Sequence, residues 1–267
     1  MTYCVAMRLD AGLVFLSDSR TSAGVDQINT FRKMHFFERR GERVVVLMTA
    51  GNLAISQSVV NTLRERMERD RERNLCNVPN MFEAAKHVGD CLREVHARDA
   101  KSLKEFGVDF SAALVLGGQV KGEEPRLFHI YSAGNFTEAT QETPYFQLGE
   151  SKYGKPIIVR VINNLTSLEE AVKCALISMD SSICSNLSVG LPLDLLIYER
   201  DAMRVAHYCI IGEDSAYFAQ IRKLWSHRLR EVFGELPNPD WDKLNLTAEV
   251  LRQTAASPWT RSGSREN

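Results

Sequence analysis

The amino-acid sequence predicts an α+β fold of layered sheets and helices, organised as one domain. Three observations support this class: the candidate strands occur in hairpin-like pairs, the candidate helices occur in separate blocks, and no internal repeat or linker divides the chain. Strands that pair as hairpins favour a layered α+β sandwich over a parallel βαβ fold. The chain has 267 residues, of which 44% are hydrophobic and 25% charged, so it can bury a full core.

Short β-strands are predicted for the start of the chain. Segments 3–9 and 12–17 flank a turn-forming cluster at 10–12, which indicates a hairpin. Two further strands are expected over 30–38 and 43–49, joined by a charged turn. The opening of the chain is therefore expected to be all β.

Two long helices are predicted next. The first has apolar residues at helical spacing, namely Ile55, Val59, Leu63 and Met67. It runs into the mixed-charge stretch 64–73, which is typical of a solvated helical face. The second begins after Asn80, because Asn80 and Glu83 have the spacing of a capping box. Its apolar stripe consists of Met81, Ala85, Val88, Leu92 and Val95.

Five more strands are predicted after the second helix. They cover 109–117, 126–132, about 144–148, 193–199 and 203–211. The first three precede a third helix and the last two follow it. The order along the chain is therefore strands, two helices, strands, one helix, strands and one helix.

The two remaining helices and the end of the domain follow from caps and composition. Ser167 and Glu170 have capping-box spacing at the start of the third helix. The last helix carries an apolar stripe of Phe218, Ile221, Trp225, Leu229 and Val232. From Pro237 onward the composition turns polar. We therefore predict a domain over 1–235 and a partly flexible C-terminal extension over 236–267.

Composition and charge exclude several classes of function. Lys and Arg total 33 against 34 Asp and Glu, which gives no reason to expect nucleic acid or a membrane as partner. The longest apolar run, 44–48, is far shorter than the roughly 20 residues of a membrane span. The six cysteines and six histidines show no metal-binding spacing. We therefore expect a cytoplasmic protein without a metal or an organic cofactor.

A threonine directly after Met1 points to one kind of chemistry. If Met1 is removed, Thr2 has a free α-amine whose reference pKa is about 7.7–8.0, so one residue supplies both nucleophile and base. A lysine nearby, for which Lys33 is the candidate, lowers the pKa of both groups, and Asp18 can hold that lysine. The backbone N–H of Gly51, at a strand end, can bind a developing oxyanion.

Each of these residues also has a plain structural interpretation when it is taken alone. Met-Thr begins many proteins that use no such chemistry, and Asp18 can serve in a turn. Lys33 can be a solvated lysine, and Gly51 can be a turn glycine before a helix. Only their joint occurrence at these separations indicates catalysis.

Two sequence blocks around these residues resemble proteasome β-subunits. Residues 17–24 read SDSRTSAG and are similar to the family's ADSRATAG block. Residues 49–52 read TAGN and are similar to its strand-end MAGG block, with Lys33 between the two. The pattern is most similar to the bacterial Anbu (ancestral β-subunit) branch and extends over about 2–235 in the order of elements.

The resemblance implies the N-terminal-nucleophile hydrolase fold, which is a four-layer αββα sandwich. It implies Thr2 as the nucleophile with its own amine as base. It further implies Asp18 and Lys33 as the activating pair and the Gly51 N–H as a member of the oxyanion hole.

The resemblance also implies accessory groups, and here the chain departs from the family. Asp180 and Ser188 are similar to the helix-end aspartate and the following serine that form hydrogen bonds near the threonine amine. Where the family has Gly-Ser-Gly, this chain has Gly149, Glu150 and Ser151. Either Ser151 is shifted, which makes it a further candidate for the substrate pocket, or Glu150 has replaced the serine.

Strand alternation suggests a substrate pocket beside the lysine. Phe31, Lys33 and His35 share one face of the predicted strand. Phe31 and His35 are therefore candidates to line a pocket, as are Thr49 and Leu53 beside the glycine loop. Ordinary strand packing explains these four residues equally well.

We interpret the sequence as a threonine-type endopeptidase that hydrolyses peptides or unfolded proteins. The family resemblance implies a homo-oligomer, built as a stacked ring or as an open spiral, since a head-to-tail interface closes only when its rotation fits. Two alternatives remain: a weakly active or inactive assembly protein of the same fold, and a specialised amidase with the same nucleophile. Retention of Thr2 with Lys33 favours an enzyme.

Overall fold

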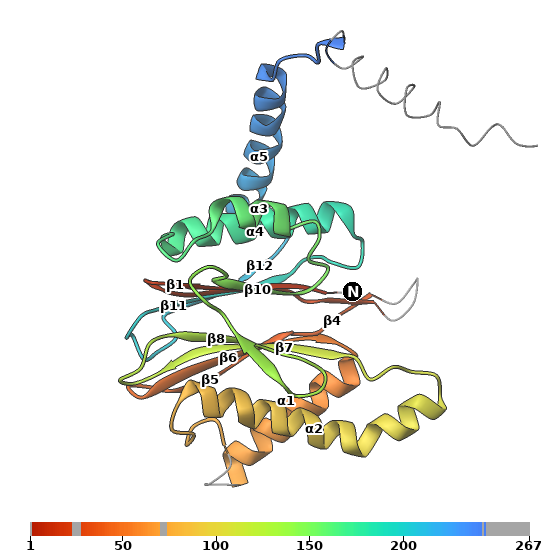
Figure 1. Cartoon of the computed structure of the whole chain (residues 1–267), viewed down its shortest axis with the longest axis vertical. Helices are drawn as coiled ribbons and strands as arrows, with labels where there is room; N and C mark the ends of the chain where they lie inside the picture. The colour runs from red at the N-terminus through yellow and green to blue at the C-terminus, as the bar shows by residue number, and fades with distance from the viewer. Residues whose placement is uncertain (1, 23–27, 70–73, 242, 244–267) are drawn as a thin grey trace, which may run out of the picture. The chain divides into compact units, whose positions relative to one another are not determined.

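Figure 1 shows the computed structural model of the chain. It describes residues 2–22, 28–69, 74–241 and 243. These residues belong to two compact units, 1–222 and 223–267. The first unit contains both large sheets, and the second contains the later turns of the last helix, α5 (Ala216–Glu235). The domain boundary at 235 stays a prediction.

The first unit is a four-layer sandwich of helices, sheet, sheet and helices, which confirms the predicted α+β class (Figure 1). One layer is an antiparallel five-stranded sheet in the order β10-β1-β2-β11-β12. Its strands are β1 (Tyr3–Leu9), β2 (Gly12–Asp18), β10 (Tyr145–Gly149), β11 (Leu193–Glu199) and β12 (His207–Ile211). The predicted hairpin of the first two strands is thus confirmed, with Leu9 opposite Gly12.

The other large sheet is also antiparallel and has the order β5-β6-β7-β8-β9. Its strands are β5 (Met34–Arg39), β6 (Arg43–Gly51), β7 (Ala112–Val120), β8 (Arg126–Ile130) and β9 (Phe136–Glu138). Its two longest strands, β6 and β7, pair along their whole length.

Helices cover the outer face of each sheet. Residues of α1 (Leu53–Arg69) and α2 (Met81–Glu105) pack on the β6–β7 sheet, while α3 (Lys155–Val161) and α4 (Leu168–Ser185) pack on the β1–β2 sheet. Both predicted caps are present. The Asn80 side chain accepts from the Glu83 N–H at 2.8 Å, and Ser167 forms a complete capping box with Glu170. In the described residues no helix is long and apolar enough to cross a membrane.

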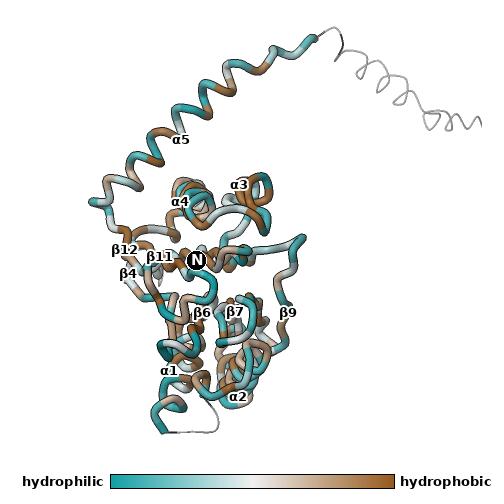
Figure 2. Tube along the Cα trace, turned by 90° about the vertical axis from the view of Figure 1, so that its left-hand side faces the viewer, coloured by the Kyte–Doolittle hydropathy of each residue, from teal (hydrophilic) through white to brown (hydrophobic). Residues whose placement is uncertain are grey.

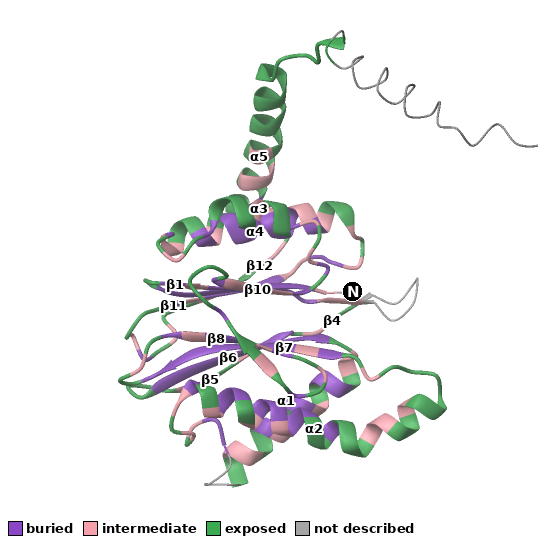
Figure 3. Ribbon diagram, in the orientation of Figure 1, coloured by how far each residue is buried: buried purple, intermediate pink, exposed green. Residues whose placement is uncertain are grey.

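Three apolar clusters hold the four layers together. One lies between α1, α2 and their sheet, one between α3, α4 and theirs, and one between the two sheets. Figure 3 shows the consequence, because the buried residues are concentrated in the strands and on the helix faces toward them. The same inner surfaces are the hydrophobic ones in Figure 2. Hydrophobic burial at three interfaces therefore fixes the sheets on which the site is built.

The predicted strand over 30–38 is interrupted, and this correction matters for the site. A short strand β4 (Ile28–Thr30) pairs with β3 (Arg20–Ser22), whereas β5 begins only at Met34. Between them, residues 31–33 connect a separate two-stranded sheet, β3–β4, to the β5–β9 sheet. The Phe31 N–H donates to the Ser19 carbonyl at 2.9 Å, and the Lys33 carbonyl accepts from the Thr49 N–H at 2.9 Å.

Other differences are local. The sequence did not predict α3 or β9, which are short, and β7 begins at Ala112, three residues later than expected. The strand expected over 203–211 begins at His207, because Asp201 and Met203 adopt positive φ values of 63° and 49°. The Gln119 side chain holds this turn, since its Oε1 accepts from the Asp201 N–H at 2.9 Å.

Candidate active site

A cavity of about 610 Å³ lies where β1 begins and β6 ends. It is lined by Thr2, Thr21, Lys33, Thr49, Ala50, Gly51, Asn52, Leu53, Ser56 and Gly149. The structure therefore brings together three residues that the sequence analysis singled out separately, Thr2, Lys33 and Gly51. No group of acidic, histidine or cysteine residues in the described part of the chain is arranged to hold a metal ion.

Thr2 is held from both sides by backbone hydrogen bonds. Its carbonyl accepts from the Glu150 N–H at 2.7 Å, and the next residue, Tyr3, donates its N–H to Asp18 Oδ1 at 3.0 Å. Gly149 has φ +76°, and a Cβ there would lie 1.9 Å from the Thr2 carbonyl oxygen. Only glycine fits this approach, so the end of β10 positions Thr2 through its backbone.

Lys33 forms a buried ion pair with Asp18. Lys33 Nζ donates to Asp18 Oδ1 at 2.7 Å and to the Arg20 carbonyl at 2.7 Å. Asp18 is fully buried and Lys33 is 6% exposed. Burial raises the pKa of Asp18, whereas the Lys33 ammonium and the Tyr3 N–H act in the opposite direction. The pair therefore fixes a cationic group at the cavity wall beside Thr2.

Gly51 ends β6 in a conformation that favours glycine. Its φ is +106°, and a Cβ would lie 2.4 Å from the Ser111 carbonyl oxygen. The next N–H, of Asn52, donates to the same oxygen at 2.8 Å, and the Asn52 side chain caps α1 by accepting from the Ala54 N–H at 3.0 Å. The close approach of β6 and β7 thus shapes the backbone that lines the cavity.

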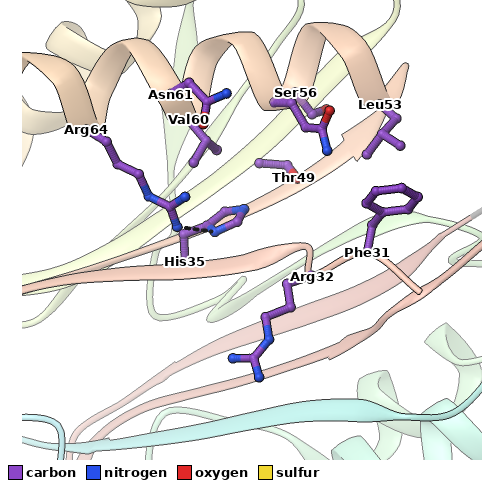
Figure 4. Close-up of a pocket in the computed structure, with 10 residues that line it drawn as sticks. Phe31, Arg32, His35, Thr49, Leu53, Ser56, Val60, Asn61 and Arg64 are labelled. Carbon is purple, nitrogen blue, oxygen red and sulfur yellow. Dashed lines mark hydrogen bonds between the residues drawn. The ribbon is translucent and has the colours of Figure 1, made fainter. Parts of the chain in front are cut away.

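A second cavity of about 340 Å³ adjoins the first, and Figure 4 shows residues that line it. The two share three lining residues, Thr49, Leu53 and Ser56. The predicted pocket residues Phe31, His35, Thr49 and Leu53 all line this second cavity. Ser151, the fifth predicted pocket residue, lines neither cavity.

The predicted accessory residues Asp180 and Ser188 form hydrogen bonds with other residues, and their role near the threonine amine stays a prediction. Asp180, in α4, accepts from Arg222 Nε at 2.5 Å, and the Ser188 N–H donates to Asn186 Oδ1 at 3.0 Å. Neither Asp180 nor Ser188 lines the cavity that contains Thr2. Glu150 is buried and accepts from Asn186 Nδ2 at 3.1 Å. These contacts support α4 and the loop that follows it.

Several residues of the site were missed by the sequence analysis. Tyr3 supports the site through the N–H that binds Asp18, while its hydroxyl lies in the cluster with α3 and α4, where it shares a 2.5 Å hydrogen bond with Ser178 Oγ and burial raises its pKa. Thr21 lines the main cavity, and its buried hydroxyl has no hydrogen-bond partner among the described residues. Thr21 stands within the 17–24 block, so that resemblance could have indicated it. Nothing in the sequence indicated Tyr3 or Arg64, which lines the second cavity.

Comparison with known proteins decides the family. The family model described as "Proteasome subunit" matches residues 2–189. Anbu (ancestral beta-subunit) from Yersinia bercovieri is 55% identical, with a TM-score of 0.84, over 89% of this chain and 98% of that one. The chain belongs to the Anbu branch of the proteasome subunit family. The expected four-layer fold and the resemblance in the first 55 residues are thereby confirmed.

Other solved Anbu structures agree. The helical assembly of the Anbu complex from Pseudomonas aeruginosa is 52% identical over 89% of this chain and 98% of that one, with a TM-score of 0.85. Anbu from Hyphomicrobium sp. strain MC1 is 46% identical over 89% and 99%, with a TM-score of 0.82. A comparison with curated proteins gives no match. The likeness to Anbu therefore extends well beyond the motif-bearing residues to most of the chain.

Proposed function

We propose that this chain is a threonine peptidase of the N-terminal-nucleophile type. The observation that carries the proposal is the gathering of Thr2, Lys33 and Gly51 at one cavity, with Asp18 buried behind Lys33. Its substrates are peptides or unfolded protein segments, which can enter as extended chains. The proposal requires that the chain be cleaved between Met1 and Thr2, so that Thr2 carries a free α-amine.

The first half of the reaction acylates Thr2. Thr2 Oγ attacks the peptide carbonyl carbon, and the α-amine of Thr2 accepts the hydroxyl proton. The Lys33 ammonium disfavours a protonated amine and stabilises the developing alkoxide, which keeps the base and the nucleophile ready near neutral pH. The Gly51 N–H binds the oxyanion. The C–N bond then breaks, the amine proton passes to the leaving nitrogen, and an ester remains on Thr2.

The second half releases the product. Water attacks the ester carbonyl, the α-amine accepts the water proton, and the same oxyanion site is used again. Collapse of this intermediate breaks the bond to Thr2 Oγ, which recovers its proton. No metal or organic cofactor takes part in these steps, because Thr2 supplies both the nucleophile and the base.

The proposal includes self-assembly in the cytoplasm. The Anbu complex of Pseudomonas aeruginosa, 52% identical, is described as a helical assembly. By this similarity we propose a homo-oligomer with an open, helical arrangement for this chain as well. The mass of the purified protein, measured by light scattering at several concentrations, tests it. A monomer at all concentrations would contradict self-assembly and leave the chemistry of Thr2 untouched.

The first experiment on the chemistry is an intact mass of the purified chain. Loss of the Met1 mass is expected. Incubation with a peptide epoxyketone, which reacts with both the hydroxyl and the amine of an N-terminal threonine, should then add one inhibitor mass to Thr2. The variant Thr2→Ala should not be labelled, whereas Thr2→Ser should retain labelling. A chain that keeps Met1, or that is not labelled after Met1 is lost, would contradict the proposal.

One observation favours a second candidate, a weakly active assembly protein of the same fold. Asp180 pairs with Arg222, and neither Asp180, Ser188 nor Ser151 lines the cavity that contains Thr2. If these residues form no hydrogen bonds near the threonine amine, peptide turnover is expected to be slow. Labelling of Thr2 without peptide turnover would favour this second function.

A further inference from the structure

The cavity next to that of Thr2 has a charge that indicates its ligand. It shares Thr49, Leu53 and Ser56 with the main cavity, so it lies within reach of the substrate residue that Thr2 attacks. Its lining is Phe31, Arg32, His35, Thr49, Leu53, Ser56, Gln57, Val60, Asn61 and Arg64. This set includes two arginines and no acidic residue. The following inference rests on the proposed function, because it concerns the substrate of the same site.

Of the two arginines, Arg64 is the one that faces the cavity. Arg32 is directed away, as Figure 4 shows, and its guanidinium donates to the Tyr208 hydroxyl at 2.9 Å. Arg64, on α1, reaches His35 on β5 across one end of the cavity (Figure 4). Within the part of the chain that the structure describes, Arg64 forms no ion pair with a carboxylate. Its positive charge is therefore available to a ligand.

The contact between Arg64 and His35 fixes the state of the histidine. A guanidinium can only donate, so His35 Nδ1 accepts the 3.2 Å hydrogen bond and the ring proton lies on Nε2. Burial, together with Arg64 and Arg32, lowers the pKa of His35 to about 4. His35 is consequently a neutral hydrogen-bond donor through Nε2–H at neutral pH. The cavity thus presents donors and a cation at one end.

The opposite end and the walls are suited to the stem of a side chain. Phe31 and Leu53 lie at the far end from Arg64 in Figure 4, and Val60 lies between Leu53 and Arg64 along α1. Asn61 and Gln57 add side-chain amides to the lining. Apolar contacts would hold methylene groups, and a charged group would be drawn to the end where Arg64 lies.

We propose that this cavity selects an acidic side chain, above all glutamate, at the residue whose carbonyl Thr2 attacks. The carboxylate pairs with the Arg64 guanidinium and accepts from His35 Nε2–H. Lysine and arginine side chains are rejected by the charge of Arg64, and glutamine, which has the shape of glutamate without its charge, loses the ion pair. The enzyme would then cleave after acidic residues.

The test compares four peptide epoxyketones that differ only in this side chain: Glu, Gln, Leu and Lys. The full-length protein is used, and the rate at which each labels Thr2 is followed by intact mass. Because the carboxylate of the Glu compound forms a charge-assisted hydrogen bond with Arg64 and the Gln amide does not, we expect the Glu compound to label Thr2 about tenfold faster. The Lys compound should be the slowest.

Two variants assign the effect to Arg64. Arg64→Met should reduce the Glu/Gln ratio to about one, and Arg64→Glu should make the Lys compound faster than the Glu compound. Arg69→Met is the matched control, because Arg69 is an exposed arginine of the same helix that lines neither cavity. It should keep the wild-type ratio. Thermal unfolding of each variant establishes that Arg64→Met is folded.

The outcomes separate this inference from the proposed function. If no compound labels Thr2 of the wild-type protein, the peptidase proposal fails and the acidic preference fails with it. If Thr2 is labelled but Glu and Gln react equally, or if Arg64→Met keeps the wild-type ratio, the acidic preference is wrong while the nucleophile stands. A Glu preference that is lost in Arg64→Met and kept in Arg69→Met supports both.

Discussion

Replacement of Lys33 by methionine separates the catalytic from the structural role of the buried ion pair. The substitution keeps an unbranched side chain but removes the ammonium group 2.7 Å from Asp18 Oδ1. Asp18 is fully buried, so its charge loses its cation within the protein interior. Removing one partner of a buried pair costs about 3–5 kcal/mol. We expect the free energy of unfolding at pH 7 to fall by this amount, and labelling of Thr2 to slow by about 10²-fold or more.

The pH dependence of the loss identifies its cause. Burial raises the pKa of Asp18, and Lys33 is the largest influence that opposes this rise. Without Lys33, the pKa of Asp18 in the folded state lies further above its pKa in the unfolded state. The folded variant therefore binds more protons than the unfolded one. The stability of Lys33→Met therefore falls as pH rises through the folded pKa and is recovered at lower pH. The difference in the free energy of unfolding between wild type and Lys33→Met should be smaller at pH 5 than at pH 8.

Urea unfolding followed by far-UV circular dichroism at pH 5, 6, 7 and 8 measures these differences. Lys121→Met is the control, since Lys121 is an exposed lysine in the turn after β7. The double variant Asp18→Asn with Lys33→Met should regain much of the stability without regaining the labelling rate. An equal loss in Lys33→Met and Lys121→Met, or wild-type labelling by the double variant, would refute the assigned role.

Three further predictions test the geometry of the site. Gly149→Ala should abolish Thr2 labelling, because its Cβ would lie 1.9 Å from the Thr2 carbonyl oxygen. The control is Gly122→Ala, also at positive φ but with no atom within 4 Å of its Cβ, which should lower the free energy of unfolding by only about 1–3 kcal/mol. Equal labelling of the two variants would contradict this prediction. Asp180→Asn weakens the bond to Arg222 and should lower stability by about 1–2 kcal/mol in urea unfolding, while labelling changes less than about twofold. The Glu/Gln labelling ratio should stay constant from pH 6 to 8, because the pKa of His35 is lowered to about 4; a change in the ratio near pH 6.5 would mean that His35 titrates there.

Local sequence rules predicted much of the fold. The hairpin of β1 and β2 followed from apolar segments on either side of a turn, and the starts of α2 and α4 followed from their capping residues. These features depend on contacts within a few residues. The interruption of the predicted 30–38 strand depends instead on distant contacts, because the Phe31 N–H donates to the carbonyl of Ser19, between β2 and β3, whereas the Lys33 carbonyl accepts from the Thr49 N–H of β6. Alternation along one strand cannot reveal that two distant parts of the chain bind the same segment.

The candidate site shows the same division. Thr2 could be named from the sequence because it follows Met1, and Lys33 and Gly51 because one lies between the two family blocks and the other within the second; the cavity brings all three together. The roles expected for Asp180 and Ser188 rested on the family resemblance alone, and the bond of Asp180 to Arg222 could not be foreseen because it joins α4 to α5. Arg64 stood in a mixed-charge run, 64–73, that was interpreted as a solvated face. Arg64 lines a cavity because the rotation of α1 about its axis turns this residue toward His35. The pattern of charges along the sequence does not determine that rotation.

The burial of Asp18 and Lys33 is itself an argument between the two candidate functions. A buried ion pair is weak support for stability, since well-packed apolar residues of similar volume commonly replace such a pair without loss. An assembly protein therefore gains little from it. Here the pair places an ammonium group at the wall of a cavity that Thr2 also lines, and the glycines that shape this wall exclude any side chain. If only assembly mattered, Asp18→Asn with Lys33→Met should form the same assembly as the wild-type protein and nothing else should change. We expect that assembly to be retained and the reactivity of Thr2 to be lost. The reason is that the buried Lys33 ammonium serves to keep the neighbouring Thr2 amine unprotonated.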